Sequence, residues 1–533
     1  MVTDASETDT DTAESASTGS TSAAATTDGE ESAPAAYEEL LDEYRRVANV
    51  RNARGLLSWD QQVMMPEAGT PARSQQLSTL SSLSHDLLTD DAVGEALDDL
   101  ERASLTDERA AVVREIRRQY DRAAAVPRDL VEEISTTASE ALPAWKEAKA
   151  EDDFESFVPY LRTHVDLKRE YAEHVDPDCD PYEVLFADFE PCLSLERAES
   201  ILETMRETLV PMIAEIRASE ADLATDAFTS QGTYPAADQE DLCRDVLSTL
   251  GYPWERGRFD TAPHPFSSGT TFDARVTTRF DESDPLGSLL STVHEFGHAT
   301  YTLGLPDEHY GTPLGEDRDL SVQESQSRLW ENHVGRSRAF WEHLLPTFAE
   351  HFPAAAEVTP RAAYEAANQV YEDNLVRVEA DELTYHLHIL VRFEIERALI
   401  AGDLDVEEVP AVWNDKYEEY LGVRPETDTE GCLQDIHWSH GNFGYFPTYS
   451  LGSAMAAQLY DAAAAEIDDL DAQIAAGEFD ALHAWLTEHV HRHGARYETN
   501  DLVERATGEP FTADAFVDYV SEKYGALYDL DSV

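Results

Sequence analysis

Apolar residues recur three or four positions apart over most of this 533-residue chain, and that spacing constrains the fold more than any other feature. Stretches rich in Ala, Leu, Glu and Arg show it at Tyr37–Tyr44, Asp107–Ala123, Leu195–Ala218 and Phe479–His493. A period near 3.6 predicts amphipathic helices, each with one buried face. The sequence shows neither a repeat of about 20–50 residues nor a sustained heptad, which argues against a solenoid and a coiled coil. We therefore expect a mainly α-helical fold.

One stretch, residues 271–280, departs from the helical period. Its apolar residues Phe272, Ala274, Val276 and Phe280 alternate with polar ones. Such alternation predicts a β-strand with one buried and one polar face. We expect a Ser-Ser-Gly turn just before this strand, and a small sheet that walls a site beside the helix that follows.

Acidic residues far outnumber basic ones. The 108 Asp and Glu against 39 Lys and Arg give a formal charge of −69, and only five of the 39 are Lys. Such a charge repels phosphate, so we expect neither nucleic acid nor a membrane surface as a partner. At molar salt the Debye length falls to about 3 Å, which screens repulsion between carboxylates. The composition therefore favours a halophilic host; the alternative is an ordinary acidic cytosolic protein.

The chain ends and the cysteines indicate organisation and location. Residues 1–35 hold almost nothing to bury, so we expect a disordered acidic tail there. Residues 36–533 should form one large unit with two lobes around a common cleft. Because the N-terminus lacks a basic and apolar signal segment, we expect a cytoplasmic protein. Four cysteines without paired spacing fit that reducing compartment: Cys179, Cys192, Cys243 and Cys432.

Two histidines four positions apart lie in one predicted helix, which Pro285 should open and Gly304 should end. His294 and His298 would face the same side of that helix, where both imidazoles can bind one Zn²⁺ at about 2.0–2.1 Å. Glu295 between them would point at a water on the metal and act as general base. The alternative is a pair of surface histidines.

A third metal ligand is needed to complete such a site. Glu324 follows His298 by 26 residues and lies in the next predicted helix. Two His and one Glu leave a fourth position open, as catalytic zinc requires. The alternative is an ordinary solvated Glu, which is common in so acidic a chain.

From about residue 37 onward, the chain resembles the carboxypeptidase Taq family of metallocarboxypeptidases. Six motifs carry the resemblance, in the family's order: His264–Phe266 (HPF), Asp273–Thr277 (DxRxT), His294–His298 (HExxH), Glu324–Gln326 (within HESQ), Arg377–Asp381 (RxxAD) and Gly431–Trp438 (GxxQDxHW). Two positions depart from the pattern. Gln323 replaces the usual His of HESQ, which puts a hydrogen bond to a metal ligand in doubt, and Val376 replaces an Ile or Tyr before Arg377.

The resemblance implies a fold of the neurolysin and angiotensin-converting-enzyme type, a large helical bundle around a deep substrate groove. It implies a homodimer with one divalent metal per subunit, zinc or cobalt. It also implies removal of single residues from peptide C-termini with broad specificity. We also expect His264, Asp381, Gln434 and Tyr449 to contribute to substrate binding; the first three lie within the motifs.

The oxyanion formed during hydrolysis needs a donor beyond the metal. His437, Tyr445 and Tyr449 lie in a Gly-rich aromatic stretch, residues 434–449, which we expect to be an irregular loop at the site. We favour Tyr445 or His437 as the donor. Structural packing of these rings is the alternative.

An exopeptidase also needs a cation that recognises the free α-carboxylate of its substrate. Arg suits this role because its planar fork binds a carboxylate through two hydrogen bonds. We favour Arg377, on a predicted helix over 376–400, above Arg275 on the strand. The alternative is that each pairs with its motif acid, Asp381 or Asp273.

Two rival functions remain. An endo-acting zinc oligopeptidase of the same fold would carry the same HExxH and distal Glu. A catalytically silent peptide-binding protein would keep the groove, but the intact Glu295 argues for catalysis.

Overall fold

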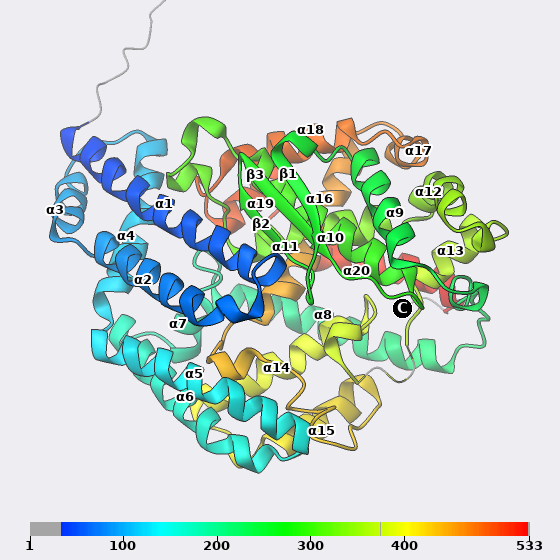
Figure 1. Ribbon diagram of the computed structural model, residues 1–533, viewed down its shortest axis with the longest axis horizontal. Coiled ribbons are helices and arrows are strands. Elements are labelled where there is room, and N and C mark those ends of the chain that lie inside the picture. Colours follow the sequence, from blue (N-terminus) through cyan, green and yellow to red (C-terminus); the bar gives the residue numbers. More distant parts are fainter. Residues whose placement is uncertain (1–33, 372, 374, 531–533) are drawn as a thin grey trace, which may run out of the picture.

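The computed structural model describes residues 34–371, 373 and 375–530. The predicted tail, residues 1–35, lies almost wholly outside them. Helices dominate, as the apolar spacing predicted (Figure 1). The helices before the sheet are α1 (Ala35–Val63), α2 (Thr70–Leu88), α3 (Asp91–Leu100), α4 (Asp107–Ala125), α5 (Arg128–Glu151), α6 (Phe154–Val175), α7 (Pro181–Phe186), α8 (Leu195–Ala218) and α9 (Ala236–Thr249). Those after it are α10 (Pro285–Gly304), α11 (Leu320–Arg328), α12 (Arg338–His351), α13 (Pro360–Ala367), α14 (Thr384–Ala401), α15 (Val409–Leu421), α16 (Pro447–Glu466), α17 (Leu470–Ala476), α18 (Asp480–His489), α19 (Thr499–Thr507) and α20 (Asp514–Tyr528).

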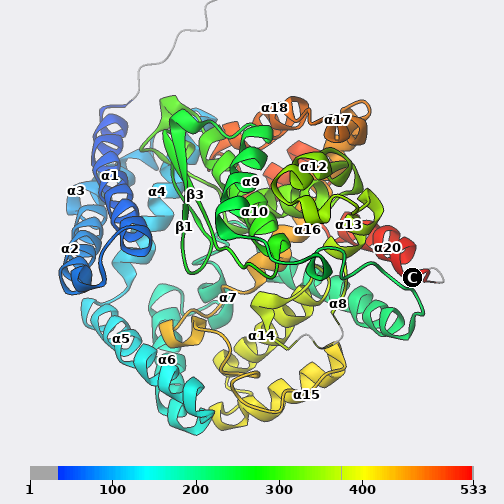
Figure 2. The ribbon, with the colours of Figure 1, turned by 45° about the vertical axis from the view of Figure 1, so that its right-hand side comes forward.

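A small sheet of three strands lies between the N-terminal helices and α10 (Figure 2). The central strand β3 (Asp273–Thr278) pairs in parallel with β1 (Gly257–Thr261) and antiparallel with β2 (Ser267–Thr270). β2 is therefore an edge strand. The predicted strand is confirmed, but the Ser-Ser-Gly segment belongs to β2 and is no turn.

The burial of β3 agrees only in part with the predicted alternation. Ala274 and Val276 are fully buried, whereas Phe272 is 47% exposed because it precedes the strand. Thr277 and Thr278 are buried as well, since Thr277 bonds Phe266 and Thr278 bonds Ser288 at the start of α10. The sheet thus packs directly on the helix that carries the two histidines.

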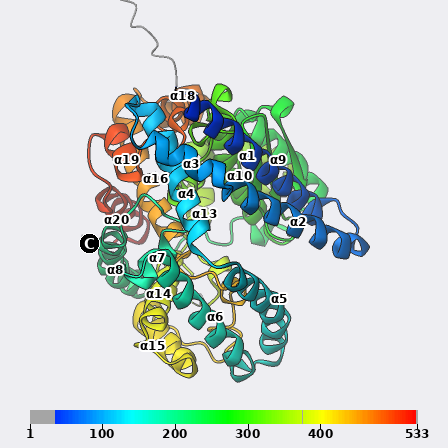
Figure 3. The ribbon, with the colours of Figure 1, turned by 90° about the vertical axis from the view of Figure 1, so that its left-hand side faces the viewer.

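Two hydrophobic cores and one small cluster around Leu130 support the part of the fold that the structure describes. The larger runs from α5 to α20 and includes the fully buried Trp330, Trp341 and Trp413. The smaller joins α1, α3 and α4 around Leu40, Leu97 and similar residues. Figure 3 shows α1–α4 grouped above α5 and α6. Among the described residues, no helix is both long and apolar enough to cross a membrane.

The helix predicted over 376–400 starts later than expected. Arg377–Glu379 form a 3-10 turn, and α14 begins only at Thr384. Asp381 is the cause: its Oδ1 accepts hydrogen bonds from the amides of Leu383 and Thr384, as an N-cap does. Arg377 therefore lies on the segment before the helix.

The predicted irregular loop over 434–449 is also shorter than expected. A 3-10 turn spans His437–His440, and α16 begins at Pro447, a residue suited to a first helical turn. Tyr445 lies on the loop, whereas Tyr449 lies in the first turn of α16. The last predicted helix, Phe479–His493, ends at His489 and continues as a 3-10 turn.

Candidate active site

Helices α10 and α11 bring the two histidines and Glu324 together. α10 begins where predicted, with the side chain of Asp284 accepting a bond from the Leu286 amide. Gly297, inside the HExxH motif, faces α11 so closely that a Cβ would lie 2.5 Å from the Gln326 carbonyl oxygen. On the other side of α11, a Cβ on Gly452 would lie 2.5 Å from the Glu324 side chain. The two glycines allow α11 to pack between α10 and α16 at this short distance.

The inward atoms of the three candidates converge. Oε2 of Glu324 lies 3.8 Å from Nε2 of His294 and 3.5 Å from Nε2 of His298. Ligand atoms bound at about 2.0–2.2 Å to one tetrahedral ion are separated by about 3.3–3.5 Å. These three residues form the one group of metal-ligand type among the described residues. The set therefore fits a divalent cation.

The outward nitrogens of both histidines have acceptors. Nδ1 of His294 lies 2.9 Å from Oε2 of Glu331, and Nδ1 of His298 lies 2.7 Å from Oε1 of Gln323. Such partners fix the ring so that Nε2 faces the metal. Gln323 in turn donates to Oδ2 of Asp317 at 2.5 Å. The departure at Gln323 thus preserves the hydrogen bond that the sequence put in doubt.

Glu295 lies beside this cluster with a free acceptor. The residue is only 6% exposed, and its buried Oε2 has no hydrogen-bond partner among the described residues. Burial raises the pKa of its carboxyl. An unpaired buried oxygen next to two histidines is suited to hold a water or a proton.

The charges around Glu324 keep it ionised. Burial alone would raise its pKa, but Arg328 and the two histidines lower it to about 2. Burial disfavours the charged form of His298, yet its bond to Glu324 and nearby carboxylates raise the pKa to about 9. An ionised carboxylate at this spot attracts a cation.

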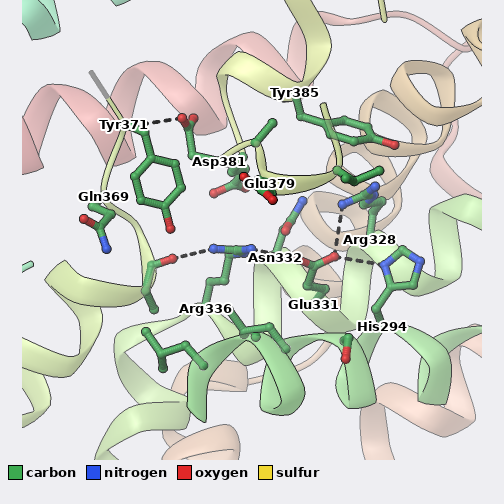
Figure 4. Close-up of a pocket in the computed structure, with 18 of the residues that line it drawn as sticks. His294, Arg328, Glu331, Asn332, Arg336, Gln369, Tyr371, Glu379, Asp381 and Tyr385 are labelled. Carbon is green, nitrogen blue, oxygen red and sulfur yellow. Dashed lines mark hydrogen bonds and ion pairs between the residues drawn. The ribbon is translucent and has the colours of Figure 1, made fainter. Parts of the chain in front are cut away.

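Two cavities meet at His294. One, the Arg377 cavity, has a volume of about 320 Å³ and is lined by His294, Arg328, Glu331, Arg336 and Arg377, among others. The other, the tyrosine cavity, has about 440 Å³ and is lined by His298, Glu324, Tyr445, Tyr449 and the edge strand β2, among others. Figure 4 shows the contacts in the first cavity that run from Arg336 through Glu331 to His294.

Arg377 reaches its cavity from a buried charge cluster. Its Nε and Nη2 donate to Oδ1 of Asp435 at 3.0 and 2.7 Å, and its Nη1 donates to the Tyr385 hydroxyl. The buried Arg392 donates to Oδ2 of the same Asp435. Two arginines against one carboxylate leave a net positive charge, and they lower the pKa of Asp435. The motif acid Asp381 does not pair with Arg377, because its oxygens cap α14.

The other predicted substrate-binding residues are distributed differently. Arg275 bonds Asp273 and stacks on Trp59 at 4.2 Å, outside the lining of both cavities. His264 is exposed and lines neither cavity. Gln434 accepts bonds from the Arg377 amide and from Arg392, so it positions the arginines.

The candidate oxyanion donors form an aromatic group. Tyr445 and Tyr449 line the tyrosine cavity with their hydroxyls 3.3 Å apart. His437 stacks behind Tyr445 with ring centroids 5.4 Å apart and does not line either cavity. Burial lowers the pKa of His437 to about 4, so its imidazole is neutral at pH 7.

Sequence reasoning missed Arg328, Glu331, Asp435 and Arg392. Arg328 is four residues after Glu324, a spacing that signals a helical ion pair. Glu331 lies in the π-helix η6 (Leu329–Gly335), which continues α11. No local sequence pattern predicted this π-helix. Asp435 lies within the GxxQDxHW motif, but its two arginine partners are far from it in the sequence.

A helix with HExxH, a Glu on its neighbour and a mainly helical fold define the class of helical metallopeptidases. The chain belongs to the carboxypeptidase Taq (M32) metallopeptidase family, whose family model matches residues 39–524. It is 39% identical to thermostable carboxypeptidase 1 of Thermus thermophilus, covering 93% of this chain and 99% of the relative. It is 37% identical to thermostable carboxypeptidase 1 of Pyrococcus furiosus, covering 91% and 98%.

A solved structure agrees with this assignment. The M32 carboxypeptidase of Deinococcus radiodurans R1 superposes with a TM-score of 0.89 at 36% identity, covering 93% of this chain and all of the other. The family predicted from six motifs is thereby confirmed, as is the helical fold. The chain is a metal-dependent carboxypeptidase, a peptide hydrolase.

Proposed function

We propose that His294, His298 and Glu324 hold one zinc ion per subunit, with cobalt as an acceptable substitute. The observation that supports this best is the convergence of Oε2 of Glu324 with both Nε2 atoms, while both Nδ1 atoms have partners. A bound zinc supplies Lewis acidity to the scissile carbonyl and acidity to a water. Two His and one carboxylate also accept other divalent ions.

Glu295 serves as general base in this proposal. Its unpaired buried oxygen takes a proton from water and passes it to the leaving amine. Its raised pKa brings it closer to working pH, which favours proton transfer in both directions. Tyr445, supported by Tyr449, donates to the oxyanion, because these hydroxyls line the same cavity as Glu324 and His298. His437 stacks on the ring of Tyr445 and so helps to position it for this donation.

Arg377 binds the free carboxylate of the substrate. Its cavity adjoins His294 on one side, and its positive charge exceeds what Asp435 neutralises, because Arg392 shares that acid. The C-terminal residue of a peptide would occupy the Arg377 cavity, and the preceding residues the tyrosine cavity along β2. Single C-terminal residues are then released. Arg275 and His264 line neither cavity, so this proposal gives them no role in binding that carboxylate.

Mass spectrometry of products from a short unmodified peptide tests the proposal, with and without a chelator, in molar KCl. We expect stepwise loss of C-terminal residues that the chelator abolishes. A C-terminally amidated copy should resist cleavage. Internal cleavage of the amidated peptide would instead support the endo-acting oligopeptidase.

We further propose a homodimer in the cytoplasm of a halophilic host, with two lobes around the cleft. The charge of −69 and the scarcity of Lys support the host assignment. Melting temperature measured against KCl checks it. A fold as stable at low salt as in molar KCl would contradict it.

A further inference from the structure

Arg328 contacts the proposed metal ligand Glu324 through a different carboxylate oxygen from the one that faces the histidines. Its Nε donates to Oε1 of Glu324 at 2.7 Å. Oε2, the other oxygen, faces both histidines and accepts only a longer bond of 3.2 Å from Ser327. The two carboxylate oxygens of Glu324 therefore have different partners.

The same guanidinium also holds the partner of His294. Nη1 of Arg328 donates at 3.1 Å to Oε2 of Glu331, the oxygen that lies 2.9 Å from Nδ1 of His294. Arg336 donates to the other oxygen of Glu331 at 2.8 Å. Arg328 thus contacts the proposed ligand Glu324 directly and His294 through Glu331. Figure 4 shows the contacts that join Arg328, Glu331 and His294.

Arg328 has little freedom to leave this position. Its side chain is 14% exposed, and its guanidinium lies 4.8 Å from the ring centroid of Tyr385. The π-helix η6 starts at the next residue. It places Glu331 and Arg336, five residues apart, on one face, where both carboxylate oxygens of Glu331 are bonded. Charge-assisted bonds from a planar, packed Arg are strong and directional.

We infer that Arg328 is a positioning residue that restricts Glu324 to coordination through one oxygen and so keeps a metal position open for substrate. The inference rests on the proposed metal site. A free Glu carboxylate can bind a metal through one or both oxygens, and two-oxygen binding would fill the position that a substrate carbonyl needs. With Oε1 bonded to Arg328, only Oε2 remains for the metal.

A role in positioning differs from a purely structural one in its effect on metal binding. If Arg328 merely held the fold together, its loss would weaken metal affinity, as the loss of supporting partners does by about 10–100-fold. If it restrains Glu324, its loss releases a second oxygen and removes a positive charge near the cation. Affinity is then retained or increased, while turnover falls.

The test compares Arg328→Met and Arg328→Lys with the wild type, with Arg338→Met as control. Arg338 is an exposed Arg with an i,i+4 partner, Glu342, and it lies outside the two cavities that meet at His294. Each protein is loaded with Co²⁺, its visible spectrum is recorded, and its affinity is measured by competition with a chelator. Four-coordinate Co²⁺ absorbs several-fold more strongly than five-coordinate Co²⁺, so the spectrum reports the number of ligands.

We expect Arg328→Met to bind Co²⁺ at least as tightly as the wild type, with a several-fold weaker visible spectrum and a kcat lowered about 10–100-fold. Lys can still donate one bond to Oε1, so Arg328→Lys should keep the strong spectrum, as should Arg338→Met. If the Met variant does not fold, Arg328→Leu replaces it, since Leu has neither a charge nor a hydrogen-bond donor.

Two results would overturn the inference: an unchanged spectrum in the folded Met or Leu variant, or a metal affinity lowered more than about tenfold. A wild-type protein that binds no Co²⁺ at these residues would instead refute the proposed metal site. The two failures are therefore distinguishable.

Discussion

One proposed metal ligand, His294, lines the same cavity as Arg377, yet the chain assembles the metal-ligand group and the Arg377 cluster differently. His294, His298 and Glu324 come from two consecutive helices that pack directly together. The Arg377 cluster joins the segment before α14, Arg392 inside α14, and Asp435 in the loop before His437. The first group depends on helical spacing and two glycines. The second depends on ion pairs between buried side chains far apart in the sequence, with two arginines sharing one carboxylate.

The two groups therefore differ in which substitutions they tolerate. On the metal side, each histidine has its own outward acceptor, so a change at Gln323 leaves the bond of His294 intact. In the Arg377 cluster one acid serves two arginines, and Gln434 bonds both as well. Loss of Asp435 would leave both buried arginines without their acid, which is costly.

The largest effect is expected on the metal side, at the base. Glu295→Gln keeps the size of the side chain and removes its basic oxygen, so kcat should fall about 10²–10⁴-fold. Metal content, measured by elemental analysis, should not change, because Glu295 is not among the proposed ligands. Hydrolysis at the wild-type rate would remove Glu295 from this role and weaken the contrast between the two groups.

A smaller effect is expected from the Arg377 cluster. Arg377→Ala should lower kcat/KM for peptides with a free C-terminus about 10–100-fold, because hydrogen bonds to a charged group contribute about that much. It should also abolish the preference for free over amidated peptides. Arg275→Ala is the matched control, since Arg275 bonds Asp273 and stacks on Trp59 away from both cavities. If Arg377→Ala keeps the preference and Arg275→Ala loses it, the two arginines have been assigned the wrong way round.

The same contrast explains which parts of the site could be predicted from the sequence. The metal group was predictable because His294 and His298 lie four apart on a helix with clear start signals, and Glu324 lies on the next. The helix start near Arg377 was predicted wrongly, because the capping bonds of Asp381 override an apolar pattern that continues through the turn. The bonds of Asp435 to Arg377 and Arg392 join segments that no local spacing relates.

Burial was equally hard to predict. Phe272 fitted the apolar face of the strand but lies before it and is exposed. The π-helix that places Glu331 beside His294 has no known sequence signature of the kind that caps and periods provide. Family motifs supplied the residues of the site, and the i,i+4 spacing signals the pair of Arg328 with Glu324, but the two arginine partners of Glu331 depend on the π-helix.

The smallest expected effect concerns Glu396, on the same helix as Arg392. This fully buried carboxyl accepts bonds from Trp438, from the Gly444 amide and from Tyr182, so it fixes both ends of the loop between His437 and Tyr445. Burial raises its pKa to about 7, with Arg392 opposing. A carboxyl whose pKa is raised by folding stabilises the fold fully below its unfolded pKa, near 4.5, and that contribution is lost as pH rises to about 7.

Between pH 5.5 and 7.5 this loss is about 2 kcal/mol. For a chain of this size that shifts the melting temperature by roughly 2 °C. Glu396→Gln cannot titrate, so its melting temperature should fall less over this interval than that of the wild type. Calorimetry of both proteins at the two pH values, at constant KCl, measures the difference in slope. If the melting temperatures of both proteins change equally with pH, Glu396 stays ionised in the folded protein. The loop beside the Arg377 cluster would then be anchored by an ionised carboxylate, as Arg377 and Arg392 are by Asp435.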